Sequence, residues 1–318
     1  MKSGQMYRFF LLLLMSICLV FGGCASSDSE TSDADSRTKP TTATTQNSQG
    51  SRDNTPKVLS AKADGTKTFT TDTAIVDISH IDEGYFMAQY TGSNEKPKLQ
   101  LTGPDGVTYT YNLSASVDTF PLTAGNGTYQ VGVYENISGT KYATVLSETF
   151  KAIITDVLKP YLYPNQYVIF TIDSLPVAKA KELAATADND LDVVSAVYNY
   201  IITTFTYDYS KASSVQSGYL PDIDKVFQEQ KGICFDYAAV MTCMLRSQQI
   251  PTRLEVGYMQ EQYHAWISIY LSDKGWINGV IQFHGNTWQM LDPTFASTSS
   301  TPKDFVANTD QYTIKYIY

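Results

Sequence analysis

The sequence is poor in the residues that build metal centres and disulfide frameworks. Its 318 residues include four cysteines and three histidines, and neither a Cys-x-x-Cys nor a His-Glu-x-x-His pattern occurs. We therefore expect no metal site, and the lack of a glycine-rich phosphate loop predicts no cofactor. Lysine and arginine number 23 against 32 aspartates and glutamates and form no basic run, which argues against a nucleic-acid-binding protein.

The sequence also lacks an apolar run long enough to span a bilayer. The longest run, from Phe9 to Phe21, follows the cationic residues Lys2 and Arg8 and leads to Gly-Gly-Cys24. This arrangement resembles a bacterial lipoprotein signal of residues 1–23, cleaved before Cys24, whose thiol would carry the lipid. An ordinary secretory signal is the alternative. In the first case the protein is lipid-anchored in the cell membrane and faces outside the cytoplasm.

Composition divides the remaining chain into three parts. Residues 24–56 are rich in Ser, Thr, Asp, Asn and Gln, which predicts a disordered Ser/Thr/Asp-rich tether. Residues 57–155 show short alternating stretches separated by turn residues, and they predict an all-β, sandwich-like (Ig-like) domain that acts as a spacer or docking module. Residues 156–318 combine helical and strand patterns, and they predict an α+β domain with one helix packed on an antiparallel sheet.

Periodicity predicts the elements of this second domain. Apolar residues spaced by three and four indicate a helix over 191–205, with Asp190 as its cap. Two further helices are expected at 222–230 and 234–249. Alternation of polar and apolar residues, together with the aromatic end of the chain, predicts strands at 252–258, 263–271, 288–292 and 312–318.

Cys234 is the first candidate for chemistry. It follows Gly232 and opens a predicted helix, where unpaired backbone N–H groups and the positive end of the helix dipole favour the nucleophilic thiolate. Cys243 lies nine residues further along the same helix, about 13 Å in rise, so an intact helix forbids a disulfide between the two. Cys243 is expected to be a buried small apolar group, and a structural core thiol is the alternative for Cys234.

His264 and Asp292 are candidates for the groups that would assist a thiol. His264 lies within one predicted strand and Asp292 at the end of another. If the two strands are neighbours, the imidazole can reach a thiolate at the helix terminus while the carboxylate fixes the imidazole tautomer. Cys234, His264 and Asp292 therefore form a candidate catalytic triad.

Three segments together resemble the signature blocks of the transglutaminase-like superfamily, and in particular its bacterial, membrane-anchored members. They are 231–238 (KGICFDYA), 263–266 (YHAW) and 291–294 (LDPT). The resemblance covers roughly residues 160–318. It implies a papain-like fold, with Cys234 as nucleophile, His264 as base and acid, and Asp292 as the residue that orients His264. The implied activity is acyl transfer on peptide or carboxamide bonds through a thioester.

Substrate and reaction stay open at this stage. Trp266, Trp288 and Tyr207 are expected to line a substrate cleft, although packing in the sheet core is the other interpretation of the tryptophans. The superfamily includes transglutaminases, proteases, deamidating enzymes and inactive binding versions. The sequence therefore predicts a surface-tethered thiol enzyme with a protein or peptide substrate, for which the cell envelope is the candidate source. The alternative is a catalytically silent, lipid-anchored peptide- or glycan-binding module.

Overall fold

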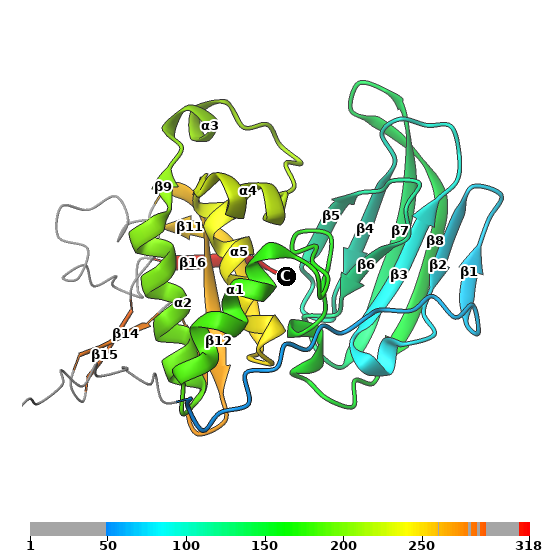
Figure 1. Cartoon of the computed structure of the whole chain (residues 1–318). Helices are drawn as coiled ribbons and strands as arrows, with labels where there is room; N and C mark the ends of the chain where they lie inside the picture. The colour runs from blue at the N-terminus through cyan, green and yellow to red at the C-terminus, as the bar shows by residue number, and fades with distance from the viewer. Residues whose placement is uncertain (1–48, 260, 279–280, 285–286, 291–311) are drawn as a thin grey trace, which may run out of the picture. The chain divides into compact units, whose positions relative to one another are not determined.

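The computed structural model describes residues 49–259, 261–278, 281–284, 287–290 and 312–318 (Figure 1). All of them belong to one compact unit that extends from Asn47 to Tyr318. In this part of the chain no helix combines the length and the apolar character that crossing a membrane requires. The predicted signal, its Cys24 and the candidate Asp292 lie outside the described residues.

The first half of the unit consists of two four-stranded antiparallel sheets. The side chains of Phe86, Phe120 and Phe150 come from both sheets, and their ring centroids lie 5.1 and 6.0 Å apart in one core. The prediction of a sandwich-like β domain is therefore confirmed. The first sheet has the order β1 (Thr68–Thr70), β2 (Ala74–Asp77), β3 (Tyr85–Tyr90) and β6 (Asp118–Pro121). The second has the order β5 (Thr108–Asn112), β4 (Lys98–Thr102), β7 (Gly127–Ser138) and β8 (Lys141–Ala152).

Five α-helices belong to the described part of the second half. They are α1 (Leu175–Leu183), α2 (Asp190–Thr204), α3 (Tyr209–Ser214), α4 (Ile223–Glu229) and α5 (Cys234–Ser247). The predicted cap of α2 is wrong by one residue: Asn189 accepts from the Asp192 N–H, and the Asp192 carboxylate accepts from the Asn189 N–H. Asp190 is the first helical residue, and its carboxylate instead binds Arg52.

The helices cover one face of an antiparallel sheet with the order β13 (Gly275–Asn278), β12 (Gln262–Leu271), β11 (Thr252–Met259) and β16 (Tyr312–Ile317). α5 packs on β11 and β12 from one side and against α1, α2 and α4 from the other (Figure 1). Every residue of α5 from Asp236 to Ser247 is buried, and Ala265, Ile267 and Ile269 of β12 join the same core. The predicted α+β arrangement of one central helix on an antiparallel sheet is thus confirmed.

Two short two-stranded pairs complete this half. β9 (Thr206–Tyr207) runs parallel to β10 (Lys231–Gly232), and β14 (Ile281–His284) runs antiparallel to β15 (Thr287–Met290). The strand predicted over 288–292 overlaps β15, and its last two residues lie outside the described ones.

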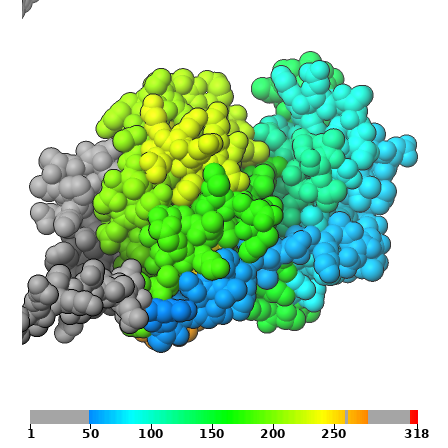
Figure 2. Space-filling model, viewed as in Figure 1, coloured from blue at the N-terminus to red at the C-terminus, as the bar shows by residue number. Residues whose placement is uncertain are grey.

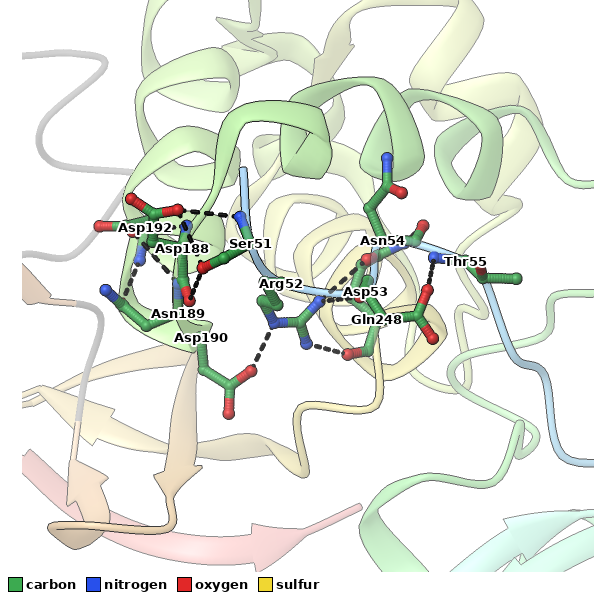
Figure 3. Close-up of polar contacts among 10 residues, drawn as sticks. All are labelled: Ser51, Arg52, Asp53, Asn54, Thr55, Asp188, Asn189, Asp190, Asp192 and Gln248. Atoms are coloured by element: carbon green, nitrogen blue, oxygen red, sulfur yellow. Dashed lines mark hydrogen bonds and ion pairs between the residues drawn. The ribbon is translucent and has the colours of Figure 1, made fainter. Parts of the chain in front are cut away.

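Residues 50–57 form a strap that binds the helical part of the chain before the first β-strand begins. Arg52 holds it: its Nε donates to Asp190 Oδ1 at 2.6 Å, and an Nη donates to the Gln248 carbonyl oxygen at 2.5 Å (Figure 3). Asn54 donates to the Lys181 carbonyl oxygen at 3.1 Å. In the space-filling view the strap lies on the surface beside the green residues of α1 and of the segment before α2 (Figure 2).

The strap overlaps the end of the tether that composition predicts to be disordered. That prediction considers only how much apolar surface the segment can bury. Polar contacts hold the strap instead, because backbone N–H groups of Gly50 and Arg52 donate to the carbonyl oxygens of Ala185 and Ala187 at 2.9 and 3.1 Å. The strap therefore ties the segment ahead of the β half to the ends of α2 and α5.

We expect Arg52→Ala to lower the free energy of unfolding by about 2 kcal/mol, because a largely buried guanidinium loses charge-assisted hydrogen bonds at both helix ends. Urea unfolding of the full chain measures this loss. Lys57→Ala is the matched control, since the Lys57–Asp53 pair is exposed and its atoms lie 3.9 Å apart. Its effect should stay within about 0.5 kcal/mol. Equal effects of the two variants would contradict a specific role for Arg52.

Candidate active site

Cys234 is the first residue of α5, as the sequence predicts for the helix start, and its side chain is partly exposed. Ile233 precedes it with an extended backbone (φ −97°, ψ 177°). The chain reaches this point through β10, where Gly232 lies opposite Tyr207 of β9 and its carbonyl oxygen accepts from the Asp208 N–H at 2.9 Å. Cys234 therefore lies at a helix start whose approach is fixed by a strand pair.

The first turn of α5 is held by Asp236, whose side chain is fully buried. Its Oδ2 accepts from the Ile233 N–H at 2.8 Å, which satisfies one of the free donors at the helix start. A Cβ added at Gly232 would lie 2.6 Å from the Asp236 Cβ and 2.9 Å from its Oδ2. Gly232 is thus required by this close approach, rather than as a flexible hinge.

Tyr263 is the residue before His264 in β12. It alternates with Ala265 and Ile267, which face α5, and its side chain is half exposed. Burial raises the pKa of Tyr263 to about 12, and neighbouring groups that include Cys234 add to the effect. β12 as a whole packs on α5.

His264 is the next residue of β12, and it lies on the opposite face of the strand from Tyr263. It is buried, with its ring centroid 6.2 Å from that of Trp266 and 6.5 Å from that of Tyr312. Trp266 is also buried and lies 4.9 Å from Tyr312, so its ring belongs to a packed aromatic layer. Cys234 and His264 thus lie on elements that pack together, α5 and β12, and the pairing of the thiol with the imidazole stays a prediction.

The structure describes the side chain of Tyr207 but only the backbone of Trp288. Tyr207 lies beside the approach to Cys234, and its ring contacts Tyr209 at 4.9 Å and Tyr237 at 6.4 Å. Trp288 belongs to β15, of which only the backbone is described. Among the described residues, no group of three or more His, Cys, Asp or Glu side chains is arranged to hold a metal ion.

Cys243 is fully buried within α5, and burial raises the pKa of its thiol well above the ordinary value. Cys234 and Cys243 are both free thiols. Cys234 is the more accessible of the two, and a reagent in solution should therefore reach it first.

Sequence analysis does not identify Glu255 of β11, which is buried on the same sheet face as His264. It lies opposite Trp266 in the strand register, and its Oε2 accepts from the Ser268 hydroxyl at 2.8 Å. Burial raises the pKa of the Glu255 carboxyl above its ordinary value of 4.5. The alternation of β11 could have placed Glu255 on this face, but no local pattern points to Ser268 as its partner.

Residues 177–279 match the family model of the transglutaminase-like superfamily. The chain contains a transglutaminase-like superfamily domain. The matched range spans α1 to β13, and it includes Cys234 and His264. Asp292 follows it.

Relatives of this transglutaminase-like domain are distant. The uncharacterized protein YebA of Bacillus subtilis (strain 168) is 27% identical over 158 residues, which cover 42% of this chain and 21% of YebA, so the chain spans about a fifth of that relative's length. A candidate cysteine protease from Cytophaga hutchinsonii is 16% identical, with 72% of this chain and 69% of that chain covered and a TM-score of 0.34. The periplasmic domain of TgpA from Pseudomonas aeruginosa, bound to ethylmercury, is 16% identical, with 72% and 75% covered and a TM-score of 0.33.

The raised pKa of Glu255 predicts that the stability of the transglutaminase-like domain depends on pH. A carboxyl whose pKa is raised on folding stabilises the fold fully below its unfolded pKa, and this stabilisation is lost as pH rises through the folded value. We expect the unfolding free energy of the wild type to fall relative to Glu255→Gln as pH rises above about 4.5. Urea unfolding at about pH 4.5, 6 and 8 measures this difference. The exposed Glu148→Gln should show no such trend, and a flat difference for Glu255→Gln would contradict the prediction.

Proposed function

We propose that this chain is a thiol acyl-transfer enzyme that acts on peptide or carboxamide bonds. The observation that carries the proposal is the position of Cys234 at the start of α5, within a transglutaminase-like superfamily domain in which α5 packs on the strand of His264. Unpaired N–H groups at a helix start favour a thiolate, which is the attacking form of a cysteine.

In the proposed reaction the Cys234 thiolate attacks the carbonyl carbon of a carboxamide, and a C–S bond forms as the carbonyl oxygen becomes an oxyanion. The C–N bond then breaks, and the His264 imidazolium gives its proton to the leaving amine. The product of this step is a thioester on Cys234. Water or a primary amine attacks the thioester, His264 takes the incoming proton, and the C–S bond breaks to restore the thiolate.

The remaining roles are proposed from the helix start and from the resemblance of the sequence to the superfamily's signature blocks. The backbone N–H of Cys234 lies in the first turn of α5, where such groups lack helical partners, and it is our proposed donor to the oxyanion. Asp292 is proposed to fix the tautomer of His264. Tyr207 and Trp288 are proposed to flank the substrate, whereas Trp266 is buried among aromatic side chains and packs in the sheet.

The proposed setting is the outer side of a membrane. Cys24 would carry the lipid, and the substrate would be a protein or peptide of the cell envelope. The support is the resemblance of the N-terminal segment to a lipoprotein signal. Hydrolysis and amine transfer share the same first half-reaction, so the acyl acceptor distinguishes them.

We expect Cys234→Ala and His264→Ala each to reduce turnover at least 1000-fold without unfolding the chain, because each removes a group required for forming the thioester. A glutamine-rich unfolded protein, offered with a fluorescent primary amine, reports cross-linking by amine incorporation. Hydrolysis is reported by new amino groups or by released ammonia.

Cys243→Ala is the matched control, because it removes the buried thiol of the same helix and should retain turnover. Full activity of a folded Cys234→Ala protein would overturn the proposed function. A wild-type Cys234 that is inert toward both acceptors and toward alkylation would instead favour the peptide- or glycan-binding module.

A further inference from the structure

The carboxylate of Asp236 is buried at the start of α5, two residues after Cys234, and it is enclosed by groups from a different segment. Lys211 of α3 places its Nζ 2.7 Å from Asp236 Oδ2. Tyr219, in the segment after α3, donates its hydroxyl to Asp236 Oδ1 at 2.6 Å. The same Lys211 Nζ donates to the Tyr219 oxygen at 2.5 Å and lies 4.3 Å from the centre of the Tyr219 ring.

The Asp236 carboxylate has two opposing electrostatic effects in the first turn of α5. Asp236 is needed there because it accepts from the Ile233 N–H, and negative charge near a helix start is favourable. A fixed negative charge in the same helical turn as Cys234, shielded from water, also opposes ionisation of the thiol. Burial of the carboxylate strengthens that opposition unless a cation lies beside it.

We infer that Lys211 is a positioning residue for the reaction of Cys234: it neutralises the buried Asp236 carboxylate and so permits a thiolate in the same helical turn. This inference rests on the proposed role of Cys234 as the reacting thiol. Lys211 does not touch the substrate; it acts through Asp236. The segment 209–222, which carries Lys211 and Tyr219, therefore sets the reactivity of the thiol as well as the geometry of the helix start.

Other charged or titratable groups near this turn differ from Lys211 in position. Tyr263 comes from β12, and Tyr219 is a neutral donor because burial and the Asp236 carboxylate raise its pKa. Lys231 lies three residues before Cys234, but its Nζ pairs with Asp208 Oδ2 at 3.4 Å and its side chain is half exposed. Solvent screens the half-exposed Lys231 ammonium, whereas the Asp236 carboxylate is fully buried.

The test is the pH profile of Cys234 alkylation in the full chain. Iodoacetamide is applied from about pH 5 to 10, and mass spectrometry of the peptide that contains Cys234 gives the rate at that thiol alone. We expect Lys211→Met to raise the pH of half-maximal rate by about one unit, because the charge of Asp236 is left uncompensated. Lys211→Arg should keep the wild-type midpoint, since it keeps the cation.

The double variant Lys211→Met/Asp236→Asn separates charge from structure. It removes both charges and keeps an oxygen that can accept from the Ile233 N–H, so its midpoint should return toward that of the wild type. Asp236→Asn alone should lower the midpoint, because it removes the negative charge and leaves the Lys211 cation. If Lys211→Met does not fold, this variant tests whether the two charges control the thiol. Lys231→Met is the matched control, with the same loss of charge at a half-exposed lysine whose carboxylate partner is Asp208, and it should shift the midpoint by less than about 0.3 unit.

An unchanged midpoint in folded Lys211→Met would overturn the inference. A double variant shifted as far as Lys211→Met would overturn it too, because the effect would then be structural. The measurement needs no turnover, so a protein with the expected midpoint shifts but no acyl transfer would contradict the proposed function and leave the role of Lys211 supported.

Discussion

The buried carboxylate of Asp236 is the constraint on which the candidate site depends. It accepts from the Ile233 N–H, from Lys211 and from Tyr219, and its approach leaves no room for a side chain at Gly232. These contacts fix the direction in which α5 begins. Since α5 packs against three helices on one side and two strands on the other, its start cannot shift without disturbing the core.

The same contacts connect stability with reactivity. A helix start stabilises both a capping carboxylate and a thiolate, but two negative charges in one turn disfavour each other. The ion pair with Lys211 reconciles the two, and Lys211 belongs to α3, a short helix without buried residues. The part of the structure that compensates the charge is thus less firmly packed than α5, which carries the thiol.

Sequence periodicity predicts the long elements well, because α2, α5, β11 and β12 each present a regular apolar face to the core. It misses α1 and α3, which lack a clear apolar stripe, and β9 and β10, which are two residues long. It places Cys234 at a helix start, but it does not find Lys211 or Tyr219 as partners of Asp236. Those partners lie 25 and 17 residues away in sequence, and only the tertiary fold brings them together. Residues 24–48 and Asp292 lie outside the described residues, so their predicted roles remain predictions.

The alternation of β12 determines how a thiol and an imidazole can meet in this fold. Tyr263 shares the face that packs on α5, and His264 shares the face of Trp266 and the buried Glu255. Both residues lie near the start of β12, where the strand pairs with the end of β11. The helix α5, which carries Cys234, packs on one face of β12, and His264 lies on the other face. The thiol and the imidazole can therefore react only if they meet around an end of the strand. That strand end, where Tyr258 pairs with Tyr263, is therefore where the proposed pairing of His264 with Cys234 would form.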